Sequence, residues 1–358
     1  MPGSKVDMNQ LLKIVVDRNA SDLHISAGSP PCIRVDELLL PVDGAEELGP
    51  EDSKRLAYGL LTPVQVETFE REKELDMSFG LSGLGRFRVN VFYQRGTVGI
   101  AIRMLPLAPR TFAECGLPEK VIVDLCRRPK GLVLVTGATG SGKSTTLAAM
   151  VEWINRDRQC HIITIEDPIE YVHANARAVI DQREIGSDTH SFANALKHAL
   201  RQDPNVILIG EMRDLETIGA ALTIAETGHL VFATLHTSDS AQTINRVIDV
   251  FPAHQQQQVK VQFSFVLLGV LSQQLIPRTG GTGRILAVEI MLATPAIRSL
   301  IREGKTHQVY SVIQTGQRDG MRTMNQSLAE LCTKKAITYE DAIGRSTDPD
   351  ELLRLMQR

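Results

Sequence analysis

Residues 137–144 read Gly-Ala-Thr-Gly-Ser-Gly-Lys-Ser, which fits the phosphate-binding pattern G-x-x-x-x-G-K-[ST]. In such a loop, successive backbone N–H groups point at phosphate oxygens, and the helix that follows presents its positive end to the same anion. Lys143 would reach the β- and γ-phosphates, and Ser144 would give Mg²⁺ a hydroxyl ligand. We therefore expect ATP to contact Gly137, Ala138, Thr139, Gly140, Ser141, Gly142, Lys143, Ser144 and Thr145.

Glu211 is a second candidate for phosphate chemistry. It follows the apolar run Val206–Ile209, which has the form of a buried strand that delivers a carboxylate to its end, as in a Walker B motif. This pattern predicts that Glu211 is a partner of Mg²⁺, acting through a water. Without the phosphate-binding loop, a core strand followed by a surface glutamate would explain the pattern better.

Between these two motifs, an apolar strand ends in three carboxylates, Glu166, Asp167 and Glu170, grouped around Pro168. Hydrolysis needs a group that orients the attacking water, and a carboxylate near the γ-phosphate can do so. Spacing alone does not rank the three carboxylates. A solvated acidic turn is the competing interpretation.

Two histidines, His229 and His236, bracket an apolar run that we expect to form a strand near the nucleotide. A histidine at a strand end can contact a γ-phosphate and respond to its loss. A lone histidine is more often a structural residue, so the pattern leaves both interpretations open.

These residues lie in a region where short apolar runs and helical segments alternate. This order predicts an α/β domain with a mainly parallel, buried sheet. Beyond Pro252 we expect mostly helices and one strand, Arg284–Met291. The expected strands before Pro252 are Leu132–Thr136, Ile162–Ile165, Val206–Ile209 and Leu230–Leu235, and the expected helices are Ser144–Asn155, Phe192–Arg201 and Leu215–Glu226.

The N-terminal part has a different pattern, which predicts a small α+β unit. A helix is expected over Met8–Asp17, and later strands alternate apolar residues with arginines. Arg88 and Arg103 fall on the face opposite the apolar stripe. Several prolines then indicate a linker, which predicts an N-terminal domain over 1–104, a linker over 105–118 and the ATPase domain over 119–358.

Composition limits the classes of function. The net charge is −3 and the pI about 6.3, so there is no overall basic field that would draw the protein to nucleic acid. The five cysteines show no metal or disulfide spacing. The longest apolar stretch, Val266–Leu271, is too short to span a membrane, and no signal peptide is evident, so we expect a cytoplasmic protein without an integral membrane segment.

The chain resembles the secretion ATPase superfamily and, within it, the type IV pilus retraction ATPases. The resemblance covers nearly the whole sequence, and its most specific stretches are residues 137–146, 164–170, 210–217 and 226–232. It implies a PAS-like N-terminal domain, a RecA-like P-loop domain and a homohexameric ring. It also implies that Glu170 is the catalytic base with Glu166 beside it, that His229 contacts phosphate, and that Arg88 and Arg103 neutralise phosphate charge within a subunit or across the ring.

Residues 296–303 resemble a motif that is associated with retraction, AIRNLIRE, with Ser299 where asparagine is usual. The residues of interest are Ala296, Ile297, Arg298, Leu300, Ile301, Arg302 and Glu303. They form one short amphipathic helix, for which a plain packing role is the alternative. The resemblance implies a platform protein of the inner membrane as partner, at its cytoplasmic face. A nucleic-acid translocase, another secretion-system assembly ATPase and a slowly hydrolysing assembly protein are the competing functions.

Overall fold

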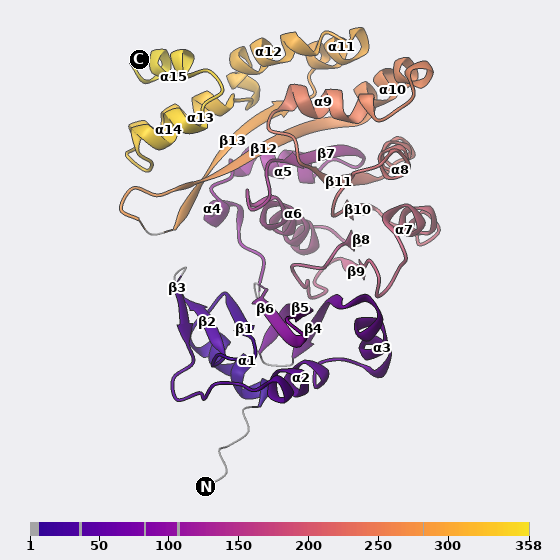
Figure 1. Ribbon diagram of the computed structural model, residues 1–358. Coiled ribbons are helices and arrows are strands. Elements are labelled where there is room, and N and C mark those ends of the chain that lie inside the picture. The colour runs from indigo at the N-terminus through magenta and orange to yellow at the C-terminus, as the bar shows by residue number, and fades with distance from the viewer. Residues whose placement is uncertain (1–6, 36–37, 82–83, 106–107, 282, 358) are drawn as a thin grey trace. The chain divides into compact units, whose positions relative to one another are not determined.

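The structure is a computed structural model that describes residues 7–35, 38–81, 84–105, 108–281 and 283–357 (Figure 1). The chain divides into two compact units, Met1–Ala108 and Pro109–Arg358. The first holds an antiparallel sheet and the second a mixed sheet, so the expected α/β class is confirmed. The finer division into 1–104, 105–118 and 119–358 stays a prediction.

The first unit packs helices on one face of an antiparallel sheet with the strand order β3-β2-β1-β6-β5-β4. The side chains of alternate strand residues, among them Phe87, Val89 and Val91, are fully buried against the helices. The expected apolar stripe and the expected first helix are therefore confirmed. The elements are α1 (Met8–Asp17), β1 (Asp22–Ile25), β2 (Cys32–Val35), β3 (Leu38–Pro41), α2 (Pro50–Tyr58), α3 (Pro63–Glu72), β4 (Glu74–Leu81), β5 (Gly85–Gln94) and β6 (Thr97–Met104).

The second unit is built on a sheet with the order β13-β12-β7-β11-β10-β8-β9. Its strands pair in parallel, except that β13 is antiparallel to β12. The strands are β7 (Gly131–Thr136), β8 (His161–Glu166), β9 (Val179–Glu184), β10 (Val206–Ile209), β11 (Leu230–Leu235), β12 (Leu267–Pro277) and β13 (Arg284–Leu292). Since five of these strands carry an unbroken run of apolar residues rather than an alternating one, both faces of the sheet need cover.

Helices supply that cover on both faces (Figure 1). One core lies between the sheet and α4 (Phe112–Cys115), α5 (Glu119–Cys126) and α6 (Lys143–Asp157). The core on the other face includes α7 (Phe192–Ala199), α8 (Leu215–Glu226), α9 (Ser240–Asp249), α10 (Ala253–Val266), α11 (Pro295–Glu303) and α12 (Val309–Thr315). Helix α4 falls within the stretch expected as a linker, where Phe112 is buried in the core.

Two strands differ from the expectation. Beyond Pro252 the chain has a second strand, β12, so the prediction of a single strand there was wrong. The apolar run Val266–Leu271 has no repeat of apolar and polar residues that would indicate a helix or a strand. Its conformation is decided by pairing with β7 on one side and β13 on the other. The edge strand β9 was also missed, because Val179–Glu184 has two apolar residues followed by four polar or charged ones and so lacks the alternation of a half-buried strand.

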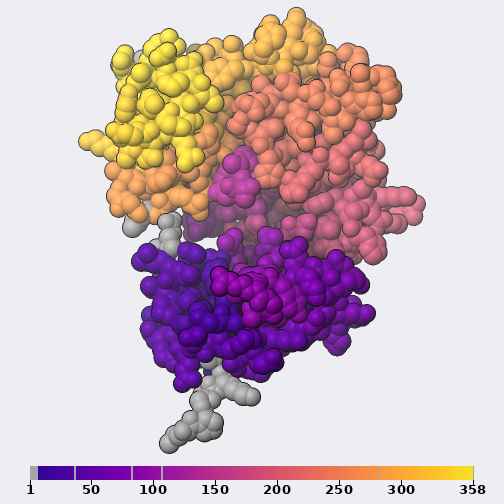
Figure 2. Space-filling view, viewed as in Figure 1, coloured from indigo at the N-terminus to yellow at the C-terminus, as the bar shows by residue number. Residues whose placement is uncertain are grey.

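The C-terminal helices pack against the antiparallel end of this sheet. They are α13 (Met324–Thr333), α14 (Tyr339–Arg345) and α15 (Pro349–Met356), and with β12 and β13 they bury a separate small core. The space-filling view shows these helices in yellow, continuous with the orange surface of the strands (Figure 2). Within the described ranges, no helix combines the length and apolar character needed to cross a membrane.

Candidate active site

Most of the predicted chemical residues of the second unit gather at the carboxyl edge of its sheet. Strand β7 ends at Thr136, directly before the loop 137–142, and α6 begins at Lys143. Strands β8, β10 and β11 run parallel to β7 and end at the same edge, which brings Glu166, Glu211 and His236 toward the loop. Ligands of open parallel sheets bind at this edge.

The loop has the conformation of a phosphate cradle. Lys143 is 9% exposed, and its Nζ donates to the main-chain oxygens of Gly137 at 2.8 Å and Ala138 at 3.0 Å. Gly140, with φ of +77°, faces open space. The hydroxyl of Ser141 is buried and has no hydrogen-bond partner among the described residues, so a phosphate oxygen would satisfy it. The loop residues therefore suit a nucleotide.

Two of the predicted carboxylates act electrostatically on Lys143. Burial lowers the pKa of Lys143, and the negative charges of Glu211 and Glu170 oppose that effect. Glu170 and Glu211 are thus brought together with the phosphate-binding lysine, although they lie 41 residues apart in the sequence.

Glu211 is held by the side chains of Arg213 and His236. Its carboxylate accepts hydrogen bonds from Arg213 Nε at 2.5 Å and Arg213 Nη2 at 2.7 Å, and His236 Nε2 lies 3.0 Å from Glu211 Oε1. Burial alone would raise the pKa of Glu211, but these partners lower it below its usual value. The carboxylate is therefore ionised and fixed in orientation at neutral pH. Neither Arg213 nor its role was expected from the sequence.

Glu166 lies deeper than Glu170. Its Oε1 accepts from Thr164 Oγ1 at 2.7 Å and from Gln182 Nε2 at 3.4 Å. Burial raises the pKa of Glu166 to about 7, despite these hydrogen bonds. A cavity of about 30 Å³ lies between Glu166 and Ser144, with Gly210 and Thr234 on its wall. Polar walls and this size suit a single water molecule.

The acidic turn is positioned by the missed strand β9. Glu184 Oε2 accepts a hydrogen bond from the backbone N–H of Ile169 at 3.1 Å, and Gln182 Nε2 donates to the main-chain oxygen of Tyr171 at 2.8 Å. The hydroxyls of Tyr171 and Thr145 are 3.0 Å apart, which ties the turn to the P-loop helix. No periodic pattern in the sequence indicated Gln182 or Glu184, because residues 181–184 are all polar or charged.

The two histidines lie at opposite edges of the sheet. His229 precedes β11, beside Gly131 at the start of β7, and its Nδ1 lies 3.0 Å from the Ile224 oxygen. His236 follows β11 at the P-loop edge and contacts Glu211. Six residues of strand separate the two histidines from each other by roughly 20 Å. The structure thus brings His236, and not His229, together with the loop of the same chain.

Arg88 and Arg103 belong to the first unit. They are directly opposite each other on β5 and β6, and both are exposed. Arg103 Nε donates to Asp22 Oδ1 at 2.8 Å, and Arg34 also lies within 3.9 Å of Asp22. Arg103 is therefore oriented by a carboxylate on β1, whereas no ion pair of Arg88 occurs within the described residues. Their predicted role at a nucleotide stays a prediction.

The helix of the retraction-type motif is α11. Ile297 and Ile301 are fully buried, and Leu300 packs partly buried against the same core. Arg302 is stacked 6.0 Å from the ring centre of Phe265, which is 65% exposed. The apolar side of the predicted amphipathic helix is therefore confirmed.

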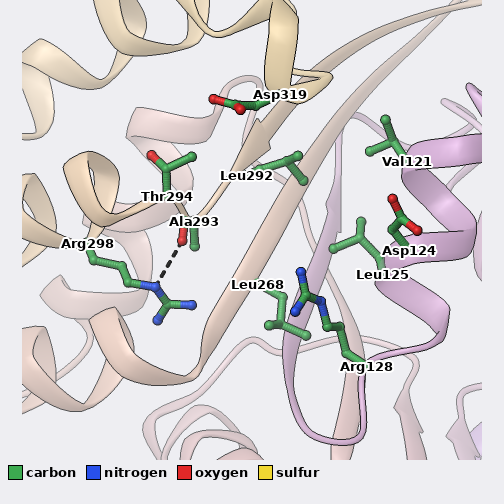
Figure 3. A pocket seen from close by; sticks show the side chains of 10 residues that line it. All are labelled: Val121, Asp124, Leu125, Arg128, Leu268, Leu292, Ala293, Thr294, Arg298 and Asp319. Atoms are coloured by element: carbon green, nitrogen blue, oxygen red, sulfur yellow. Dashed lines mark hydrogen bonds between the residues drawn. The ribbon is translucent and has the colours of Figure 1, made fainter.

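Arg298 is not a free surface arginine. Its guanidinium donates to the main-chain oxygens of Ala293 at 2.9 Å, Phe265 at 2.6 Å and Leu267 at 2.9 Å, and also to that of Ser264. The oxygens of Ser264, Phe265 and Leu267 lie at the end of α10 and the start of β12, so Arg298 satisfies main-chain acceptors at this junction. Figure 3 shows the bond to Ala293 and the side chain lying at a cavity of about 430 Å³ whose opposite wall is α5.

Comparison with known proteins agrees with this geometry. Residues 5–343 match the family described as "Type II/IV secretion system protein". The chain belongs to this family. One relative of this secretion family, the "Type IV pilus retractation ATPase PilT" of Pseudomonas aeruginosa, is 49% identical over 96% of this chain and 99% of its own length. A "Twitching motility protein" of Neisseria gonorrhoeae is 46% identical over 90% of this chain and 86% of its own.

A solved structure of the same secretion family superposes over almost the whole chain. It is the crystal structure of "the Pilus Retraction Motor PilT and Bound ADP", with a TM-score of 0.92, 49% identity and coverage of 98% of this chain and 99% of the other. A match over 98% of this chain extends into both units.

Proposed function

We propose that this protein is an ATPase motor that drives retraction of a type IV pilus. The observation that carries the proposal is the convergence of the P-loop lysine with Glu170 and Glu211 at one edge of the sheet. The relatives of highest similarity quoted above are described as a pilus retraction ATPase and a twitching motility protein. Both descriptions concern pilus retraction or motility, and not only the binding of ATP.

Nucleotide binding falls to the loop 137–142 together with Lys143, Ser144 and Thr145. Mg²⁺ usually keeps several waters and takes one or two protein oxygens beside substrate phosphates. Ser144 and Glu211 suit such a site, and within the described ranges no three His, Cys, Asp or Glu side chains cluster to hold a metal by themselves. The ion would neutralise charge on the phosphates, while Arg213 and His236 keep Glu211 ionised and oriented.

Water activation is assigned to Glu170, with Glu166 as the alternative. Glu170 is within electrostatic reach of Lys143, which supports a place near the γ-phosphate. Glu166 has a pKa of about 7 and borders the small cavity beside Ser144, so it is well matched to accept a proton near neutral pH. Substitution of each carboxylate by its amide separates the two.

Sensing of the γ-phosphate is assigned to His236 in place of His229. His236 contacts Glu211 at the P-loop edge, whereas His229 lies at the other edge. Arg88 and Arg103 remain the candidates for an additional positive charge, which is worth about 10³ to 10⁵ in rate in other phosphoryl-transfer systems. They act within a subunit or across a subunit interface.

The assembly proposal follows the family resemblance. The first unit is a PAS-like domain and the second a RecA-like domain, and six copies form a ring. The ring works at the cytoplasmic face of the inner membrane on a platform protein, with α11 as part of the retraction machinery. The low charge of the chain argues against the alternative of a nucleic-acid translocase.

The test joins an enzymatic and a cellular measurement. Purified protein is assayed for phosphate release from ATP with Mg²⁺, and the gene is expressed in a bacterium that lacks its own retraction ATPase. We expect hydrolysis and restored twitching motility, and the loss of both in Lys143→Ala, which removes the charge on the phosphates. Absence of hydrolysis by the parent protein rejects the ATPase; hydrolysis that DNA stimulates, without restored motility, favours the translocase.

A further inference from the structure

Gln273 lies beside the P-loop, on the strand that flanks it. Strand β12 runs parallel to β7, and Ser272 is paired in register with Thr136, the last residue before the loop. Thr136 Oγ1 also donates to Ser272 Oγ at 3.0 Å in a fully buried environment. The residue after Ser272 is therefore level with Gly137, where the loop begins.

The main chain of Gln273 contacts this loop directly. A Cβ atom at Gly137 would lie 2.4 Å from the carbonyl oxygen of Gln273, and Gly137 has φ of +140°. Only glycine permits both this approach and this conformation. The loop thus starts in van der Waals contact with the backbone of β12.

The side chain of Gln273 holds the helix that follows the loop. It is 1% exposed, and its Nε2 donates to Thr146 Oγ1 at 2.7 Å. Thr146 lies in the first turn of α6, two residues after Ser144, and is itself 2% exposed. A buried hydrogen bond of this kind is costly to break, because it leaves a polar atom unsatisfied.

The amide group of Gln273 has a role beyond packing. Gln273 Oε1 is buried and has no hydrogen-bond partner among the described residues, as is the case for the hydroxyl of Ser141 in the loop. A side chain needed only to fill space would be satisfied by an apolar residue of similar size. The retained amide therefore serves the hydrogen bond that it donates to α6.

We propose that Gln273 is a positioning residue for ATP hydrolysis, which fixes the first turn of α6, and with it Ser144, against the flanking strand. The proposal rests on the proposed ATPase function. It requires a neutral side chain at this position that hydrogen-bonds to Thr146. A negative charge here would oppose phosphate binding, even though the Thr146 hydroxyl could donate to a carboxylate.

The decisive variant is Gln273→Glu, compared with Gln274→Glu as a matched control. The introduced carboxyl at 273 is buried, so its pKa is raised and it donates a hydrogen bond only while protonated. Gln274 is the next residue on the same strand, faces the opposite side of the sheet and is half-buried. Both variants add the same charge, but only the first adds it at the P-loop.

ATP turnover is measured for the parent and both variants from about pH 6 to pH 8.5, together with thermal unfolding at each pH. We expect kcat/KM of Gln273→Glu, relative to the parent, to fall about tenfold across this range, as the carboxyl ionises and its negative charge opposes phosphate binding at the P-loop. Gln274→Glu should follow the parent profile throughout.

A flat ratio for Gln273→Glu, or an equal fall in both variants, overturns the proposal. Gln273→Met keeps the size of the side chain but cannot donate to Thr146, so it tests the hydrogen bond itself and decides alone if Gln273→Glu does not fold. A pH-independent loss of about tenfold in a folded protein supports the positioning role, and parental turnover rejects it. Lack of hydrolysis by the parent itself would instead reject the proposed function, and the two failures are thereby distinguished.

Discussion

Glu166→Gln is expected to stabilise the protein at alkaline pH while leaving it unchanged at acidic pH. Burial raises the pKa of Glu166 from an ordinary value of 4.5 to about 7. The folded state therefore binds this proton more tightly than the unfolded state does, and stability falls as pH rises through that interval. The amide cannot ionise, but its oxygen still accepts the hydrogen bond from Thr164.

The size of the effect follows from the two pKa values. Each unit of difference corresponds to about 1.4 kcal/mol, which sets an upper limit of about 3 kcal/mol on the cost of ionised Glu166. Solvent that reaches the partly exposed residue reduces this amount. For a unit of this size, about 2 kcal/mol corresponds to a shift in Tm of roughly 4–8 °C.

Thermal unfolding of the parent and Glu166→Gln is measured from about pH 4 to pH 8.5, without nucleotide and with a chelator present. We expect equal Tm values at the acidic end and a higher Tm for the variant at the alkaline end. The control is Asp167→Asn, an exposed carboxylate in the same turn, for which a change within about 0.5 kcal/mol is expected. A pH-independent difference between parent and Glu166→Gln would refute the reasoning.

Four further outcomes test the site and the motif helix. Glu170→Gln should bind ATP without hydrolysing it; hydrolysis by this variant together with inactivity of Glu166→Gln in phosphate release would reassign the base. His236→Ala should lower kcat by about 10² while His229→Ala stays within about threefold of the parent, and the reverse order would restore His229 to the site. Arg298→Ala should cost about 2–3 kcal/mol in thermal unfolding, because main-chain oxygens at the end of α10 lose their donor. Leu300→Ala should keep ATPase activity but not motility, and loss of hydrolysis would mark it as core.

The sequence by itself determined the features that depend on local pattern. The spacing of Gly137, Lys143 and Ser144 between an apolar run and a helix predicts a phosphate loop, because backbone curvature and helix polarity are local properties. The expected strands that end near Glu166 and Glu211 were likewise found, because continuous apolar runs between helices are typical of a buried parallel sheet.

Only the tertiary structure decided how distant segments meet. The parallel pairing of β11 with β7 separates His229 from His236 and places only the carboxyl end of β11, with His236, at the P-loop edge. Strand β12 exists because β7 and β13 supply hydrogen-bond partners on both sides, and this pairing alone brings Gln273 to Thr146, 127 residues away in sequence. Arg298 on α11 likewise bonds to main-chain oxygens between α10 and β12, and the helical pattern of residues 296–303 does not predict these partners. Pairing between segments that are distant in sequence selects these contacts. Their energies depend on how deeply each residue is buried, and the sequence alone does not give that burial.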